Sequence, residues 1–365
     1  MIRSCYIHIP FCEHICSYCD FSKMYYHKEW SKRYLNALEK EIHSFYKGEE
    51  LDTIYIGGGT PSSLSVSDLK HLFNILDTLK RSPSCEFTIE CNIENITEEK
   101  LKLFKKMGVN RLSIGIESSN SEILSFLERP YSKEKIISTM DLVKQSGFSN
   151  INVDLMYAIP IETMNILLED LDFILSLKVP HISTYSLMIE EHTKLSLKNI
   201  TPIDQELDLK MYETIHQKLI ESGYEHYEIS NFAKPGFQSK HNMTYWRNEK
   251  YYGFGLGASG FIHDIRYSNT RSFQDYEKGK YREVEEKISK QLDMENEIML
   301  GFRTMEGISK DTFKKKFGYD FRKIDVVPSL LEQGKLIETE TSYYIPFRYW
   351  YISNEILIHF IKEVE

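Results

Sequence analysis

The sequence predicts an α/β protein in which a large unit, built as a partial TIM-like barrel of six βα repeats, precedes a smaller C-terminal α+β unit. Six short runs rich in β-branched and aromatic residues alternate with stretches of helical length, and the pattern changes after about residue 280. Strands that alternate with helices in this way are typical of a parallel sheet. A chain of 365 residues, 41% hydrophobic and 27% charged, is long enough for one large and one small domain.

The expected strands are residues 2–9, 51–57, 85–91, 110–116, 150–157 and 180–187, and the expected helices lie near 29–47, 65–80, 97–107, 120–127, 133–146 and 164–177. In a barrel of parallel strands, functional side chains lie at the C-terminal ends of the strands. We therefore expect the chemically informative motifs to follow these runs directly.

The first run leads into three of the six cysteines, Cys12, Cys16 and Cys19, spaced C-x3-C-x2-C. A loop this short can bring three thiolates to one face of an iron–sulfur cube, which leaves the fourth iron without a protein ligand. That iron is then open to a substrate or cofactor, as the open position of a catalytic zinc is. The spacing alone leaves two alternatives, which are a structural zinc with His8 or His14 as fourth ligand and a set of unrelated thiols.

The second run ends in the segment Gly57-Gly58-Gly59-Thr60-Pro61. Glycines let a backbone approach a ligand with no Cβ in the way, so this loop is a candidate binding segment. A plain glycine turn is the structural alternative.

Carboxylates end or interrupt the next three runs, at Glu90, Glu117 and Asp154, and Arg129 follows a dozen residues after Glu117. A carboxylate can accept two hydrogen bonds from ribose hydroxyls, and an arginine can pair with the carboxylate of a ligand. Asp154 has apolar neighbours, and a buried carboxylate needs a partner. An internal ion-pair network of Glu117, Arg129 and Asp154 is the structural alternative.

Residues from about 200 to 280 extend the first unit, which we place at 1–280. A helix is expected at about 202–222, and the segment His241-Asn242-Met243-Thr244-Tyr245-Trp246 precedes a glycine-rich stretch. Because a neutral imidazole beside flat aromatic rings suits heme iron, His241 is a candidate axial ligand. The alternative is a histidine that only packs against an aromatic core.

Residues 281–365 form the predicted second unit. Helices near 309–317 and 323–333 precede two alternating runs at 335–338 and 343–345, so we expect a winged-helix-like domain. Such domains often bind DNA, but a net charge of −9 argues against nucleic acid here.

The chain is expected to stay in the cytoplasm. No apolar run approaches the ~18 residues of a membrane span, and no signal peptide precedes the cysteines. Cys5, Cys85 and Cys91 form no evident disulfide framework, which fits a reducing compartment.

The cysteine spacing is that of the radical S-adenosylmethionine (SAM) superfamily. Over its whole length the chain resembles the oxygen-independent coproporphyrinogen III oxidase-like group of that superfamily, on the motifs Tyr6-Ile7-His8-Ile9-Pro10-Phe11, the cysteine triad, Gly57 to Pro61, Asn152-Val153-Asp154 and Tyr227 to Phe232. The resemblance implies a [4Fe–4S] cluster on the three cysteines, with SAM chelated to the open iron and split by one electron from the cluster. The SAM contacts that it implies are Tyr6, Tyr18, Gly58, Gly59, Thr60, Glu90, Glu117, Arg129, Asp154 and Ser186.

Within this group the chain looks most like the heme chaperone branch. The oxidases carry a further cysteine where this chain has Phe21, and they carry an extension before the cysteines, whereas the H-N-x-x-Y-W motif of the chaperone branch is present from His241. The resemblance implies that heme is bound and handed to acceptor proteins, with an unidentified electron donor. A radical enzyme that decarboxylates a porphyrinogen is the competing interpretation. Peripheral membrane association and a monomeric or dimeric state are left open.

The chain departs from the family pattern at three places. The family usually has glutamine at Glu117, Gly-Leu-Pro-Gly at Ala158-Ile159-Pro160-Ile161, and Asn-Pro at Asn92-Ile93. A carboxylate at 117 adds negative charge near the methionine end of SAM unless Arg129 offsets it. These changes put the affinity for SAM and its turnover in question, and they leave the cysteines untouched.

Overall fold

The computed structural model describes residues 1–191, 193–198 and 200–361. Its main body is a 12-stranded sheet in the order β14-β13-β12-β11-β1-β4-β5-β6-β7-β8-β10-β9. Six neighbouring strands run parallel: β1 (Ser4–Ile9), β4 (Leu51–Gly58), β5 (Arg81–Asn92), β6 (Arg111–Glu117), β7 (Asn150–Tyr157) and β8 (His181–Ser186). They correspond to the six predicted runs, so the predicted α/β class is confirmed.

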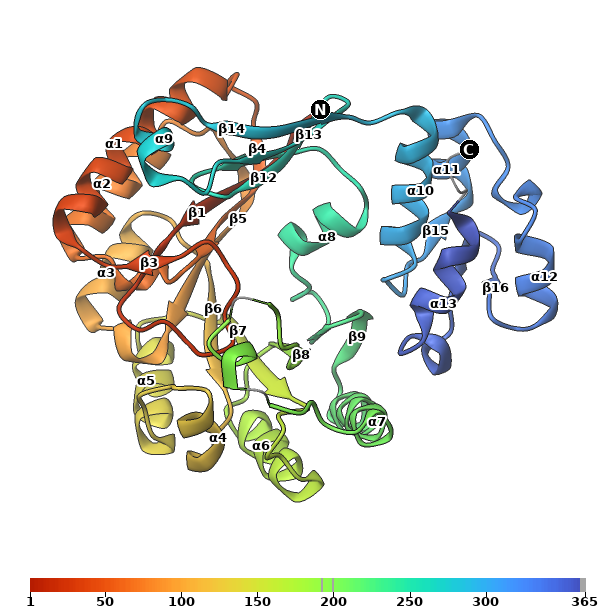
Figure 1. The fold of residues 1–365 in the computed structure, drawn as a ribbon, viewed down its shortest axis with the longest axis horizontal. Coiled ribbons are helices and arrows are strands. Elements are labelled where there is room, and N and C mark those ends of the chain that lie inside the picture. The colour runs from red at the N-terminus through yellow and green to blue at the C-terminus, as the bar shows by residue number, and fades with distance from the viewer. Residues whose placement is uncertain (192, 199, 362–365) are drawn as a thin grey trace.

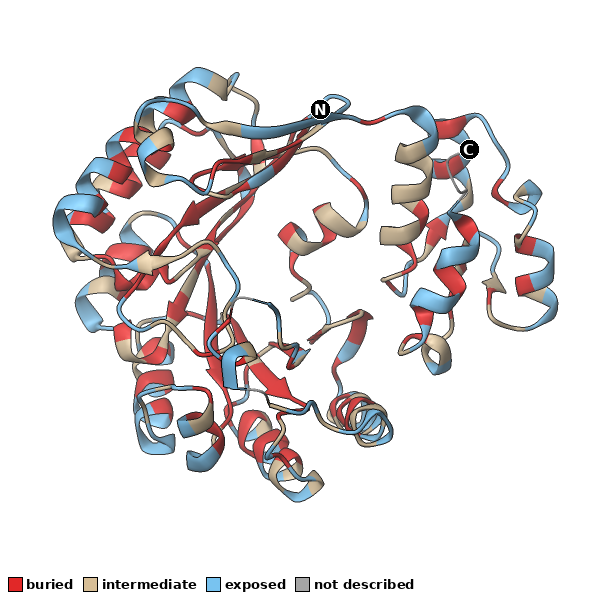
Figure 2. Cartoon of the chain, in the orientation of Figure 1, coloured by how far each residue is buried: buried red, intermediate tan, exposed pale blue. Residues whose placement is uncertain are grey.

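Helices follow these strands and cover the convex face of the curved sheet (Figure 1). They are α1 (Lys28–Phe45), α2 (Val66–Leu76), α3 (Glu98–Lys106), α4 (Ser121–Phe126), α5 (Lys133–Gln145) and α6 (Met164–Ser176). Five of them begin at a side chain that accepts a hydrogen bond from a backbone N–H of the first turn, as N-caps do; these are Ser65, Thr97, Asn120, Ser132 and Thr163. Figure 2 shows the result, with buried residues on the strands and on the inward helix faces.

The segment after residue 200 flanks both edges of the sheet. After α7 (Gln205–Glu221), β9 (Glu225–Glu228) and β10 (Asn231–Ala233) join antiparallel beside β8. At the other edge β11 (Tyr251–Phe254) runs parallel to β1, and β12 (Ser259–Ile262), β13 (Ile265–Asn269) and β14 (Arg282–Lys287) continue antiparallel. Because β14 belongs to this sheet, the first unit continues past the expected boundary at residue 280 and ends near Ile288.

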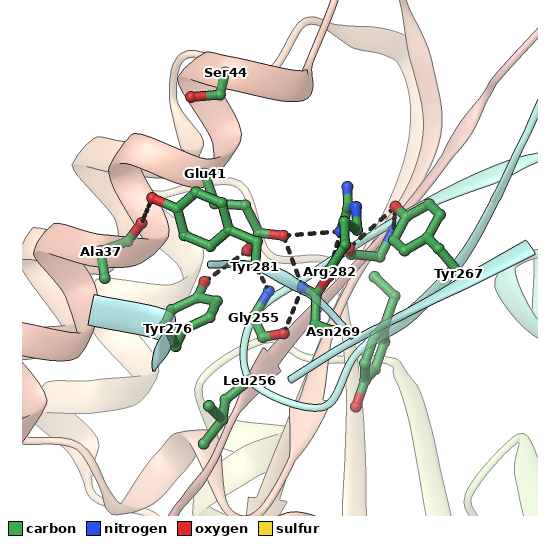
Figure 3. A network of polar contacts seen from close by, with 12 residues as sticks. Ala37, Glu41, Ser44, Gly255, Leu256, Tyr267, Asn269, Tyr276, Tyr281 and Arg282 are labelled. Atoms are coloured by element: carbon green, nitrogen blue, oxygen red, sulfur yellow. Dashed lines mark hydrogen bonds and ion pairs between the residues drawn. The ribbon is translucent and has the colours of Figure 1, made fainter. Parts of the chain in front are cut away.

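A buried carboxylate joins this second edge to α1 (Figure 3). Glu41 is fully buried and accepts hydrogen bonds from Gly255 N (2.8 Å), Asn269 Nδ2 (2.7 Å), Tyr276 Oη (2.6 Å) and Arg282 Nη1 (3.2 Å). Burial raises the pKa of Glu41, whereas these four donors oppose that rise. A buried carboxylate is stable only when it is bonded in this way, so the network holds the added strands in register with α1.

The helix α8 (Lys240–Trp246) lies between the concave side of the sheet and the C-terminal unit (Figure 1). Its first N–H groups, from Lys240 and His241, donate to the carboxylate of Glu86 in β5. Thr244 bonds Ser4 of β1 through their hydroxyls at 2.8 Å. The helix is therefore fixed to the inside of the open barrel.

The C-terminal unit combines helices with a small antiparallel sheet of order β15-β17-β16. Its elements are α10 (Lys290–Gly301), β15 (Ile308–Ser309), α11 (Lys310–Phe317), α12 (Val327–Glu332), β16 (Ile337–Glu338), β17 (Ser342–Tyr344) and α13 (Ser353–Leu357). It docks on the barrel through backbone bonds from Ile229 N to Arg303 O (2.9 Å) and from Met305 N to Tyr227 O (3.0 Å). None of the helices in the described ranges has the length and apolar character needed to cross a membrane.

Candidate functional site

A cavity of about 420 Å³ opens at the C-terminal ends of the parallel strands. Its size falls within the roughly 300–1,000 Å³ of small-molecule sites. Most of the residues predicted from sequence line it: Cys12, Cys16, Tyr18, Cys19, Gly58, Gly59, Thr60, Glu90, Glu117, Arg129, Asp154 and Ser186. Tyr6 and His241 are not among its lining residues.

The cysteine loop is closed by a short parallel pairing of β2 (Phe11–Cys12) with β3 (Met24–Tyr25). Inside the loop, Ser17 Oγ donates to Phe126 O at 3.3 Å, and Leu195 N donates to Ser17 O at 2.9 Å. These bonds tie the loop to the end of α4 and to the segment that follows β8, and all three cysteines line the cavity.

Burial opposes ionisation of two of the thiols, those of Cys12 and Cys16. It raises the pKa of Cys12 to about 11, although a hydrogen bond from the Thr60 hydroxyl (3.5 Å) opposes the rise, and it also raises the pKa of Cys16. Metal ligands must be thiolates, so iron binding here has to displace protons, and the assembly of a metal centre will depend on pH.

The glycine loop is needed for close packing against the cysteine loop. A Cβ on Gly59 would lie 3.0 Å from Cys12 Sγ and 2.9 Å from Phe11 O, and Gly58 has a φ of +115°, which favours glycine. Gly59 N donates to Ile9 O at 2.9 Å. The glycines thus let the end of β4 pack against the cysteine loop. This close packing explains the need for glycine here more specifically than the approach of a ligand does.

Arg129 is buried at the cavity wall with its charge only partly paired. Its Nη2 forms an ion pair with Glu117 and donates to the Tyr18 hydroxyl at 2.8 Å. Its Nε and Nη1 are buried and have no hydrogen-bond partner among the described residues. Buried donors are nearly always bonded, so these two N–H groups indicate a missing acceptor such as a ligand carboxylate. The internal ion pair considered from sequence is present between Glu117 and Arg129, and it still leaves Nε and Nη1 unpaired among the described residues.

Two further carboxylates face the same cavity. Glu90 accepts from Tyr55 Oη (2.7 Å) and from Gly58 N (3.0 Å), and burial raises its pKa. Asp154 is half-buried and accepts from Asn152 Nδ2 at 2.7 Å. Burial, followed by the nearby charges of Glu117 and Glu90, raises the pKa of Asp154 to about 7. Carboxyl groups outnumber cationic side chains on the lining, which includes Lys23 and Arg129 against Asp20, Glu90, Glu117, Asp154 and Glu190, so this cavity is favourable for a cationic ligand.

The smaller predicted contacts lie as follows. Thr60 Oγ1 accepts from Asn92 Nδ2 at 3.2 Å beside Cys12, and Ser186 Oγ is 3.4 Å from Asp208 Oδ1. Tyr6 Oη instead bonds His8 Nδ1 at 3.0 Å behind the cavity wall. For Tyr6, therefore, the structure supports a role in holding the first strand's end rather than a direct ligand contact.

His241 is buried in the barrel interior, and both of its ring nitrogens are hydrogen bonded. Nδ1 lies 2.7 Å from Thr53 Oγ1, Nε2 lies 2.7 Å from Tyr245 Oη, and the ring stacks on Tyr55 with centroids 5.0 Å apart. Burial lowers its pKa to about 3. In this geometry neither nitrogen is available to iron, so the placement favours the packing role over the heme ligand predicted from sequence.

The donor set fits an iron–sulfur cluster with SAM. Three thiols line one cavity, as a cluster with one open iron requires, and Arg129, which has two buried nitrogens without a partner among the described residues, lines the same cavity. Among the described residues, no three His, Cys, Asp or Glu side chains are arranged around a single ion. Thiolates on three separate irons need no such convergence, whereas the zinc alternative does, and His8 is already bonded through both ring nitrogens.

Sequence reasoning missed part of the lining, namely Asn92, Ser113, Gly115, Met156 and Tyr185. The alternation of a strand was the available signal: Gly115 and Ser113 lie two and four residues before Glu117, and Met156 lies two residues after Asp154. Side chains two apart on a strand share a face. The family departure at Ala158 also has a structural consequence, since its φ is 57°, a conformation that favours glycine.

Comparison with known proteins identifies the class. Residues 6–174 match the radical SAM superfamily, and residues 288–345 match the HemN C-terminal domain. The second match begins where β14 ends, which agrees with the boundary seen in the fold. Barrel, cysteine triad and cavity thus define a radical SAM protein, a class that implies a [4Fe–4S] cluster and SAM.

The particular family follows from full-length relatives. The chain is 39% identical to the heme chaperone HemW of Bacillus subtilis (strain 168) over 383 residues, which covers 100% of both chains. It is 38% identical to HemW of Lactococcus lactis subsp. lactis over 99% of this chain and 98% of the relative, and 32% identical to HemW of Escherichia coli (strain K12) over 85% of each. The chain belongs to the HemW family.

A solved structure shows the same fold over nearly the whole chain. Coproporphyrinogen III oxidase (HemN) from Escherichia coli superimposes with a TM-score of 0.86 at 19% identity, covering 98% of this chain and 90% of that one. At this identity the likeness concerns architecture alone, and it confirms the arrangement of a barrel followed by a small C-terminal domain.

Proposed function

We propose that this protein is a heme chaperone that carries a [4Fe–4S] cluster, binds SAM and passes heme to acceptor proteins. The proposal rests on the similarity to heme chaperones along the entire chain. The alignment reaches 39% identity and covers 100% of both proteins. The cavity supports it, because thiols, glycine loop and charged side chains are gathered as the family pattern requires.

We assign the cavity residues as follows. Cys12, Cys16 and Cys19 hold the cluster, which supplies electrons and an open iron to SAM. An unpaired N–H group of Arg129 receives the SAM carboxylate through a charge-assisted hydrogen bond. Glu90 keeps one lone pair on each oxygen, beyond the bonds from Tyr55 and Gly58, for ribose hydroxyls.

The negative balance of the cavity supports this orientation. SAM carries a sulfonium and an ammonium charge, and Asp154 has no cation beside it in the described structure. The Glu117–Arg129 pair offsets the carboxylate that replaces the usual glutamine. An electron donor, heme-accepting partners, a cytoplasmic location, the oligomeric state and any membrane association remain predictions.

The first experiment is anaerobic reconstitution followed by titration with heme and with SAM. We expect one saturable heme site per chain, and heme-loaded protein should restore the activity of an apo heme enzyme. Absence of saturable heme binding would contradict the chaperone assignment.

A porphyrin product assay tests the competing enzyme. Phe21 occupies the position of the oxidases' additional cysteine, so we expect no conversion of coproporphyrinogen to protoporphyrinogen with SAM and a reductant. Turnover in this assay would establish the radical-enzyme interpretation instead.

A further inference from the structure

A chain of hydrogen-bonded side chains leads from the cavity into the barrel interior. It begins at Asp154 of β7, which lines the cavity and accepts from Asn152 Nδ2 at 2.7 Å. Asn152 Oδ1 lies 2.5 Å from His181 Nδ1 of β8, and His181 Nε2 lies 2.8 Å from Tyr227 Oη of β9. Tyr227 Oη accepts from the backbone N–H of Ser239, the N-cap of α8, at 3.2 Å. All four residues behind Asp154 are buried.

The chemistry of its two ends fixes the direction of every hydrogen bond in this chain. A carboxylate only accepts, so Asn152 turns its NH2 group toward Asp154 and its carbonyl toward His181. His181 Nδ1 must then carry the hydrogen. Burial lowers the pKa of His181 well below its usual value, so the ring is neutral and Nε2 accepts from the Tyr227 hydroxyl. The N–H of Ser239 can only donate, and all donors therefore point toward Asp154.

The amide of Asn152 has no unused hydrogen-bonding position. Its Nδ2 also donates to Ser113 Oγ at 2.8 Å, and its Oδ1 also accepts from Ser183 Oγ at 3.0 Å. An amide has two hydrogens and two lone pairs, so these four bonds saturate it. Loss of the His181 donor would leave a buried lone pair of Asn152 unpaired, which is costly, and would weaken the hold on the orientation of the amide.

The bonds of His181 differ from those of His241 in where they lead. His241 is bonded to Thr53 and Tyr245, and neither of these residues lines the cavity. The chain through His181 ends on a carboxylate of the cavity lining. Among the described residues no lysine or arginine pairs with Asp154, so neutral donors orient its carboxylate.

We propose that His181 and Tyr227 are positioning residues of the SAM site, which hold the amide of Asn152 and through it direct the carboxylate of Asp154 at the cationic part of SAM. This inference rests on the proposed function, since it concerns the cavity assigned to SAM there. Hydrogen bonds in a chain polarise one another, and a binding side chain is held precisely when the residues behind it are themselves locked. Neither His181 nor Tyr227 lines the cavity, so each acts through Asn152 and Asp154.

The test is a calorimetric SAM titration of the full-length, anaerobically reconstituted protein with two variants of similar shape at one position. His181→Leu removes the donor and should weaken SAM binding about tenfold, because residues of one hydrogen-bond network are coupled by energies of this order. His181→Asn loses the same ring but places an amide N–H where Nδ1–H stands, so it should bind SAM within about twofold of wild type. Iron and sulfide content should be unchanged in both, and their melting temperatures should fall alike.

The same pair of variants is then compared in an Asp154→Ala background. If His181 acts through Asp154, the leucine and asparagine variants should bind SAM equally there, whereas a general structural role would leave the difference in place. Tyr227→Phe, which keeps the ring and removes only the hydroxyl, should also weaken SAM binding, and it carries the test if His181→Leu does not fold. Tyr224→Phe is its control, since it removes a buried hydroxyl that donates to Val179 O at 2.5 Å away from the cavity lining.

Two results would overturn the positioning role while SAM binding itself stands. One is equal SAM affinity of His181→Leu and His181→Asn with Asp154 present, and the other is a difference between them that persists in the Asp154→Ala background. If wild type binds no SAM, the proposed function fails and this inference fails with it, so the two failures are distinguishable.

Discussion

The cavity and the α8 region are both rich in buried polar groups, and they differ in whether those groups are bonded within the protein. In α8, both nitrogens of His241 have partners, and no side-chain nitrogen or oxygen of residues 240–246 is buried without one. In the cavity, Arg129 has two buried nitrogens without partners in the described structure. Since an unpaired buried donor costs roughly 1–3 kcal/mol, the cavity is arranged for a ligand and the α8 region for stability.

This comparison changes the role that we assign to the H-N-x-x-Y-W segment, residues 241–246. From sequence, its histidine and aromatic residues suited a heme site. In the structure the same side chains attach α8 to β4, and Asn248 just beyond the helix bonds Asp293 of α10 at 2.7 Å. The segment links the barrel to the C-terminal unit.

The largest effect is expected at the cysteines. Cys16→Ala should abolish cluster binding, because two thiolates cannot replace three ligands of a cube with one open iron. Iron and sulfide analysis with the visible spectrum measures this. Cys85→Ala is the control, since Cys85 is buried and is not among the residues that line the cavity, and it should keep full iron content. Retention of a full cluster in Cys16→Ala would remove that residue from the site.

Arg129→Ala should weaken SAM binding at least tenfold while leaving iron content intact. Charge-assisted hydrogen bonds contribute about 1.5–3 kcal/mol, and 1.4 kcal/mol corresponds to a factor of ten in affinity. Calorimetric titration measures the change, and Arg247→Ala, which removes an exposed pair with Glu306, is the control.

The variant Glu117→Gln removes the internal ion pair but keeps Arg129. It therefore shows whether loss of the ion pair alone changes the affinity for SAM. It retains Arg129 and releases its Nη2 from the carboxylate, so SAM affinity should equal or exceed that of wild type. Equal SAM affinity in Arg129→Ala and wild type would contradict the assignment of Arg129.

His241→Ala should act on stability and leave SAM binding unchanged. Loss of two buried hydrogen bonds and of the ring packed on Tyr55 should lower the free energy of unfolding by about 2–4 kcal/mol. Denaturant unfolding of the apo-protein measures this. Should the variant unfold like wild type but lose its heme spectrum, His241 would be a ligand and the contrast between the two regions would fail.

The smallest effect concerns pH, and it compares Asp154 of the cavity with Glu228, a buried carboxylate of β9 that does not line the cavity. The pKa of Asp154 is raised to about 7, and that of Glu228, whose carboxylate accepts from Ser230 N at 3.0 Å, is also raised to about 7. Unfolded carboxyls titrate near pH 4. Each folded group therefore keeps a proton that the unfolded chain has lost, so the stability it contributes is full below about pH 4 and is lost as pH rises through about 7.

Asp154→Asn and Glu228→Gln should each flatten the fall of the melting temperature between pH 5 and pH 8. Only the cavity variant should also weaken SAM binding. Thermal melts over that pH range, with SAM titrations at one pH, test both statements. An unchanged pH slope in both variants would mean that neither carboxyl holds its proton in the folded protein.

The sequence alone determined the class of fold and the grouping of Cys12, Cys16 and Cys19 in one loop. Alternating runs of strand and helix length predicted the six parallel strands, and cysteines spaced within one loop need no distant segment to come together. Glu90, Glu117 and Asp154 were predicted to lie together because each belongs to the last part of a parallel strand. Parallel strands place their C-terminal ends at one edge.

Only the tertiary structure decided which polar atoms remain unpaired. The sequence offers His241 as a candidate ligand, yet in the structure both of its ring nitrogens are bonded, by Thr53 of β4 and by Tyr245. The same applies to Arg129, whose pairing with Glu117 leaves two nitrogens unpaired. Hydrogen bonds between residues more than a hundred positions apart depend on how the strands pack, and local residue patterns carry no record of that packing.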